Sequence, residues 1–68
     1  MVMFLNPLRA LRVDRGLSVS ELAGAASMSR AELVAVESGE RMLTRDQAVD
    51  LAQRLRVDPG TLAAYVAA

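Results

Sequence analysis

Apolar residues recur every three or four positions in short blocks along the chain, which is the spacing of helices that bury one face. Serine, threonine, asparagine or aspartate precedes each block, and glycine or proline separates several of them. Five such blocks follow one another without a repeat, a linker or a low-complexity tract. The pattern predicts five short helices and an all-α fold.

Capping signals indicate where these helices begin. The starts are expected at Asn6-Pro7, at the capping boxes Ser18-Val19-Ser20-Glu21 and Ser29-Arg30-Ala31-Glu32, at Thr44, and at Asp58-Pro59. Gly16 is expected to end the first helix. The second should run from about Val19 to Ala26, and the third should stop at Ser38-Gly39. Only a short turn then separates the second helix from the third.

Length and composition limit how this fold is stabilised. The 68 residues suffice for one domain with one small core, so we assign residues 1–68 to a single domain. The chain has no cysteine and no histidine, so it lacks a disulfide framework and the usual zinc ligands. The acids are spread over caps and helix surfaces, and the serines cap helices. We therefore expect no metal, no cofactor and no enzymatic activity.

The first six residues form an apolar amino-terminal arm, residues 1–6, that lies outside the helical pattern. Phe4 and Leu5 either pack on the domain or contact a partner. The arm lacks the charged leader and long apolar core of a signal peptide, and no segment approaches the ~20 apolar residues of a membrane-spanning helix. A cytoplasmic protein without membrane contact is expected.

Charge is balanced over the whole chain but clustered locally. Eight arginines face eight acidic residues, and the isoelectric point is about 6.1. The basic excess of a strong nucleic-acid binder is therefore absent. Arginines nevertheless gather in the first segment (Arg9, Arg12 and Arg15) and near the middle (Arg30, Arg41 and Arg45). A local basic face remains compatible with the sequence.

Two capped helices joined by a short turn are what a helix-turn-helix requires. The stretch from Gly16 to Ala23, followed by Met28-Ser29-Arg30, Leu33, Val36, Glu37 and Gly39, resembles the Cro-like phage-repressor (XRE-type) family of helix-turn-helix proteins. The resemblance spans roughly Pro7 to Val66. It implies a compact five-helix repressor-like domain in which the second and third helices form the helix-turn-helix.

The resemblance also implies roles for individual residues. The family's core positions fall on Leu17, Leu22, Ala23, Met28, Leu33, Val36, Leu51, Leu55, Val57 and Leu62. Its internal ion pair falls on Arg12 and Glu37. The recognition-helix cap and the groove-facing positions fall on Ser29, Arg30, Ala31, Val34 and Ala35. Helical geometry agrees, because Leu33 and Val36 point away from these groove-facing positions.

Three further expectations concern the edges of this site. Arg41 and Arg45 either contact phosphates or are ordinary surface charges, because Glu40 and Asp46 adjoin them. Related proteins pair through the end of the domain, so the last helix is expected to form a homodimer seam. The seam is assigned to Leu62, Tyr65 and Val66.

The chain departs from the family pattern where DNA contacts are made. Val19 stands where the second helix usually begins with a phosphate-contacting glutamine, and Ser27 stands where the turn usually has glycine. Valine and alanine can contact thymine methyl groups and Arg30 can bind guanine, but the face has few hydrogen-bonding groups. We predict a sequence-specific regulator of double-stranded DNA, either a phage-type repressor or an antitoxin. The alternative is a protein-binding helix-turn-helix module.

Overall fold

The structure is a computed structural model, and it describes residues 7–67. The amino-terminal arm, including Phe4, Leu5 and the expected cap Asn6, lies outside the described residues. Four α-helices and one 3-10 helix make up the described part: α1 (Pro7–Asp14), α2 (Val19–Ala25), α3 (Arg30–Glu37), α4 (Arg45–Leu55) and η1 (Pro59–Tyr65). The prediction of an all-α, five-helix fold is confirmed, and α2 ends one residue before the expected Ala26.

Local capping explains where three of the helices begin. Ser18 and Glu21 form the predicted box at α2, with each side chain bonded to the other residue's backbone amide. Ser29 and Glu32 do the same at α3. At α4 the cap Thr44 is also part of a full box, in which a glutamine takes the place of glutamate. Each box satisfies amides that a helix start leaves without partners.

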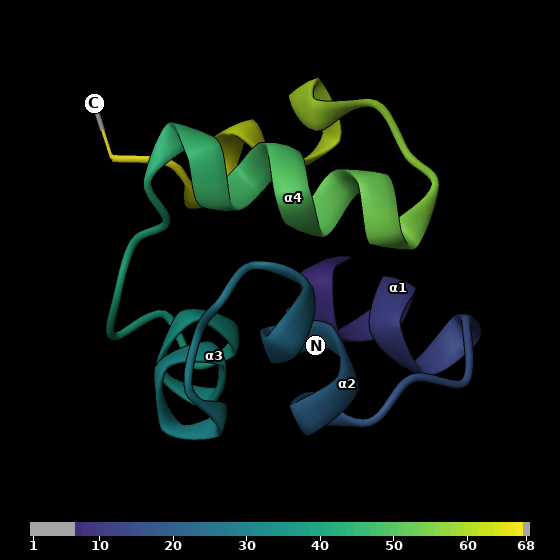
Figure 1. Cartoon of the computed structure of the whole chain (residues 1–68). Coiled ribbons are helices and arrows are strands. Elements are labelled where there is room, and N and C mark those ends of the chain that lie inside the picture. Colours follow the sequence, from purple (N-terminus) through teal and green to yellow (C-terminus); the bar gives the residue numbers. More distant parts are fainter. Residues whose placement is uncertain (1–6, 68) are drawn as a thin grey trace, which may run out of the picture.

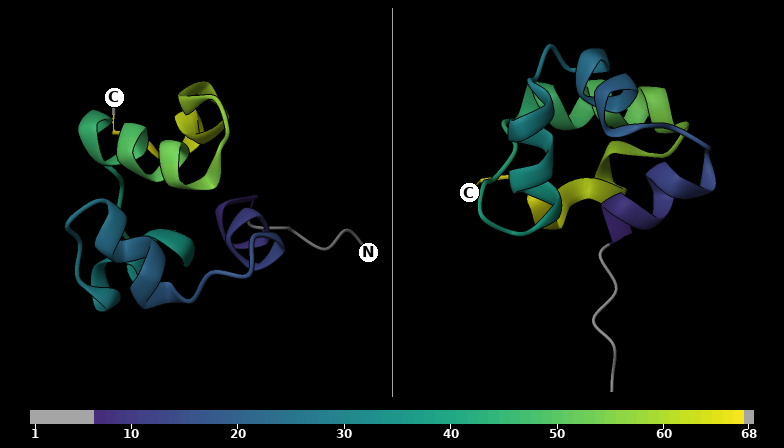
Figure 2. Two further views of the ribbon diagram at one scale, coloured as in Figure 1. Left: turned by 45° about the vertical axis from the view of Figure 1, so that its right-hand side comes forward. Right: turned by 90° about the horizontal axis from the view of Figure 1, so that it is seen from below.

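The helices enclose one apolar core in two layers. α4 and η1 lie side by side on one side of it, and α1, α2 and α3 lie on the other (Figures 1 and 2). Nine of the ten expected core residues are buried, and Val57 is half-buried against them. Leu43, which sequence analysis did not place in the core, is fully buried as well.

The carboxyl end of the described chain differs from its prediction. η1 is a 3-10 helix and ends at Tyr65, so Val66 lies beyond it. Val66 forms an isolated parallel β-bridge with Leu43. Leu43 donates its amide to the carbonyl of Tyr65 at 2.7 Å and accepts the amide of Ala67 at 3.1 Å. This pairing extends the backbone and prevents a further helical turn.

The longest described helix, α4, has 11 residues. Within residues 7–67 no helix combines the length and the apolar character that crossing a bilayer requires.

Candidate nucleic-acid interface

The turn between α2 and α3 fixes how the two helices cross. Ser27 adopts a left-handed conformation with φ of 53°. Met28 follows, donates its amide to the carbonyl of Ala23 at 2.9 Å and buries its side chain in the core. α3 thereby packs on α2 through one face and lies at the edge of the molecule (Figure 1). The opposite face of α3 is left open.

An ion pair holds the carboxyl end of α3. Arg12 Nε lies 2.7 Å from Glu37 Oε2, and Arg12 Nη2 lies 3.1 Å from Glu37 Oε1. Arg12 Nη1 also donates to the carbonyl of Leu17 at 3.0 Å. Only 12% and 9% of the two side chains are exposed, and the hydrogen bond to Glu37 raises the pKa of Arg12. The pair joins α1, the following loop and α3, as the family resemblance implied.

The outer face of α3 carries most of the expected DNA contacts. We define this outer face as the cap Ser29 together with Arg30, Ala31, Val34, Ala35 and Ser38, and the last five of these lie on the side away from the buried Leu33 and Val36. All are exposed except Ala35, which is half-buried. Among residues 7–67, no hydrogen bond or ion pair engages the guanidinium of Arg30. Its five donors are therefore open to an external acceptor.

Ala35 is less accessible than expected, and the loop after α3 folds back to bond with its backbone carbonyl. Glu40 and Arg41 donate their amides to the carbonyl of Ala35 at 2.8 and 3.2 Å. Ser38 adds a hydroxyl bond to the same carbonyl at 3.1 Å. Of the expected groove contacts on α3, Ala35 offers the smallest open surface with the loop in this position.

The same loop brings Arg41 beside α3. Arg41 Nη2 lies 3.0 Å from Glu32 Oε2, and both side chains are partly exposed. The other oxygen of Glu32 accepts the amide of Ser29 at 2.8 Å. That backbone hydrogen bond, and secondly the charge of Arg41, lower the pKa of Glu32. Sequence analysis did not foresee this contact, although the capping box already fixed where the Glu32 carboxylate points.

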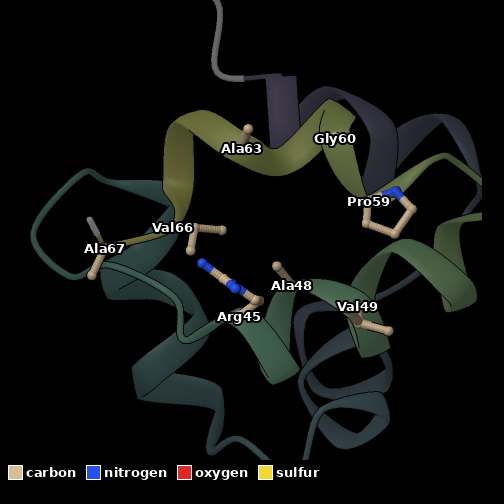
Figure 3. A pocket seen from close by; sticks show the side chains of 8 residues that line it. All are labelled: Arg45, Ala48, Val49, Pro59, Gly60, Ala63, Val66 and Ala67. Carbon is tan, nitrogen blue, oxygen red and sulfur yellow. The ribbon is translucent and has the colours of Figure 1, made fainter.

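Arg45 lies in a different place from the α3 residues. Its side chain lines a groove of about 380 Å³ between α4 and η1, together with Ala48, Val49, Pro59, Gly60, Ala63, Val66 and Ala67 (Figure 3). None of the residues that line this groove belongs to α3. We call it the α4–η1 groove. Arg45 is therefore grouped by the structure with the expected dimer seam.

One of the three residues expected at the dimer seam, Leu62, is wrongly assigned. Leu62 is fully buried in the core, so it cannot contact a second chain while the domain stays folded. Tyr65 is half-buried, and its hydroxyl accepts the amide of Leu8 at 3.0 Å, which joins η1 to the start of α1. Val66 is half-buried and lines the α4–η1 groove. Tyr65 and Val66 are the members of the predicted seam that retain exposed surface.

The described residues offer nothing resembling a metal centre, because no three acidic side chains converge within residues 7–67. The outer face of α3 can therefore bind a partner through one guanidinium and several small apolar side chains. The adjacent loop adds a second cation, Arg41.

Comparisons with known proteins agree with this geometry. The sequence model of a family described as "Helix-turn-helix domain" matches residues 6–65. A solved structure, the restriction-modification controller protein C.AhdI from Aeromonas hydrophila, superposes with a TM-score of 0.78 at 33% sequence identity. The superposition covers 84% of this chain and 86% of that one. A search of the curated proteins finds no match.

Proposed function

The chain belongs to the helix-turn-helix domain family, and from this premise we propose that it is a sequence-specific DNA-binding transcriptional regulator that inserts α3 into the major groove. The observation that carries the proposal is the open outer face of α3, held in place by the α2–α3 turn at one end and the Arg12–Glu37 pair at the other. The similarity to a restriction-modification controller protein supports a regulatory role. A cytoplasmic location is part of the proposal.

Two arginines have separate roles in this proposal. Arg30, at the amino end of α3 and without a partner among residues 7–67, binds a base edge. Arg41 binds a phosphate after exchanging its contact with Glu32, because an exposed ion pair contributes little and is readily replaced. Base contacts determine sequence, whereas phosphate contacts position the protein on any duplex.

A homodimer completes the proposed function. One short recognition helix makes few base contacts, and a second copy on an adjacent half-site multiplies them. The α4–η1 groove is the surface that supports this assignment, because it is largely apolar and includes Val66 from the expected seam. Double-stranded DNA and a second copy of the chain are thus the proposed partners.

Selection from a pool of random duplexes tests the regulator proposal. We expect a short motif to be enriched, and we expect Arg30→Ala to weaken its binding by about 1–3 kcal/mol while flattening the preference for one base pair. Arg54→Ala is the control, since Arg54 is an exposed arginine on α4 with no role in the proposal. Failure to enrich any motif contradicts the proposal.

A protein-binding module is the second candidate function. It is favoured by the balanced charge of the chain and by Val34 and Met42, each 48% exposed. The selection separates the two functions, because a module without DNA affinity enriches no motif. In that event Ala31 and Val34 become the first positions to mutate in a search for a protein partner.

A further inference from the structure

We propose that the outer face of α3 recognises the C5-methyl groups of pyrimidines, with Arg30 adding one contact to guanine. This inference rests on the proposed function and specifies which bases the site prefers. Most polar side chains on α3 and at its ends already form hydrogen bonds or ion pairs within the protein.

The two serines of this face and the neighbouring Glu32 each already form a hydrogen bond within the protein. Ser29 Oγ accepts the amide of Glu32 at 3.0 Å, and Ser38 Oγ donates to the carbonyl of Ala35 at 3.1 Å. Glu32 is half-buried, lies outside this face, and uses one carboxylate oxygen to accept the amide of Ser29.

What remains on the face is mainly apolar. Val34 is 48% exposed, and Ala31 is exposed one turn before it. The methyl group of thymine is the apolar feature that base edges display in the major groove, and alanine and similar small side chains contact it. The methyl group of 5-methylcytosine has the same position and chemistry. Val34 and Ala31 therefore match pyrimidine methyl groups better than any hydrogen-bonding edge.

The spacing of the side chains places the two kinds of contact close together. Arg30 and Val34 are four residues apart, so they lie on one side of α3, about 6 Å apart along its axis. Base pairs are stacked about 3.4 Å apart. The guanine bound by Arg30 and a methyl group touched by Val34 therefore lie within about two base pairs of each other.

The surroundings of the face favour DNA as its occupant. Arg41 stands next to α3 in the adjoining loop, and Arg30 is at its amino end. Two cations beside an apolar strip complement a groove that is rich in methyl groups and bordered by phosphates.

Removing methyl groups from DNA tests the inference directly. The duplex enriched from the random pool is synthesised again with uracil replacing thymine at single positions, which deletes one methyl group each time. At a contacted position the dissociation constant should rise about four-fold, the equivalent of ~0.8 kcal/mol for one buried methyl group. Replacing the same pair by 5-methylcytosine·guanine should bind about four-fold more tightly than cytosine·guanine, which separates the methyl group from the identity of the base.

Val34→Ala supplies the matching protein variant. It should reduce the thymine-to-uracil ratio toward one at the position that Val34 contacts. Val13→Ala, a truncation of the 58% exposed valine on α1, should leave every ratio unchanged. Both positions are exposed, so thermal melts should remain close to that of the parent protein.

The outcomes distinguish the two proposals. An enriched motif whose affinity ignores the removal of every thymine methyl overturns methyl recognition while DNA binding stands. An effect of uracil that persists unchanged in Val34→Ala overturns the role of Val34. Failure to enrich any motif overturns the regulator function, and methyl recognition with it.

Discussion

Ser27 shows how one residue can depart from its family and still keep the fold. The family that the chain resembles usually has glycine at this turn, and the structure gives Ser27 a left-handed conformation with φ of 53°. A side chain in that conformation costs about 1–2 kcal/mol, whereas glycine adopts it freely. The fold tolerates the strain because Met28, directly afterwards, is anchored in the core.

Ser27→Gly should therefore stabilise the protein. Relief of strain outweighs the greater backbone entropy of glycine in the unfolded chain, so the free energy of unfolding should rise by about 0.5–1 kcal/mol. Denaturant titration measures this change. The reverse substitution Gly39→Ser, at a φ of 86° with open space around the added atom, should lower the same free energy. A less stable Ser27→Gly protein would show that the serine has a role beyond the turn.

Accessible surface on α3 was predictable only in part. Helical periodicity correctly separated the buried Leu33 and Val36 from the exposed Arg30, Ala31 and Val34. Periodicity describes one helix by itself, so it could not indicate that a following loop bonds to the carbonyl of Ala35. The contact between Glu32 and Arg41 arises from that loop.

At the scale of helices, the Arg12–Glu37 pair links α1 to the carboxyl end of α3. Glu37→Gln should lower the free energy of unfolding by about 3 kcal/mol, because it leaves the mostly buried charge of Arg12 without its partner. Asp14→Asn is the control, since Asp14 and Arg15 form an exposed pair that should contribute less than about 1 kcal/mol. Equal effects of the two substitutions in denaturant titrations would contradict a structural role for the buried pair.

The capping boxes of α2 and α3 should make stability depend on pH. Hydrogen bonds from the backbone of Ser18 and Ser29 lower the pKa values of Glu21 and Glu32 from the ordinary 4.5. A carboxyl group whose pKa is lower in the folded protein stabilises it above that ordinary value, and the contribution is lost as pH falls through the folded pKa. Unfolding free energies should therefore decline as the solution is acidified below about 4.5.

The capping box of α4 indicates a substitution that should weaken the dependence of stability on pH. Gln47 forms the same hydrogen bonds at α4 with a side chain that does not titrate. Glu21→Gln should thus keep the cap of α2 and give a shallower loss of stability with acid than the parent protein. Identical acid profiles for the two proteins would show that the Glu21 cap is not a source of the pH dependence.

Helix starts were easier to predict than the contacts between helices. A capping box is complete within four residues, so Ser18, Ser29 and Thr44 identified the starts of α2, α3 and α4. The bridge between Leu43 and Val66 joins distant parts of the chain. Arg15 Nε likewise donates to the carbonyl of Leu55 at 2.8 Å across 40 residues. No local pattern contains such pairings.

For the whole molecule, the α4–η1 groove predicts a dimer. A glutamate introduced into the groove by Ala63→Glu should place a charge in the apolar interface and shift the protein toward monomer at micromolar concentration. Ala64→Glu is the matched control, because Ala64 is exposed but does not line the groove. Sedimentation measures both. A parent protein that is monomeric with and without DNA would exclude the dimer.

The central claim, that this domain binds DNA with sequence preference through α3, is tested most directly by dissociation constants for two duplexes over a salt series. One duplex carries the enriched motif and the other a scrambled version. We predict that both affinities fall as salt rises from roughly 50 to 200 mM, because phosphate contacts release counterions. The enriched duplex should bind at least about 10³-fold more tightly throughout. Equal affinity for the two duplexes, or affinity that ignores salt, would contradict the claim.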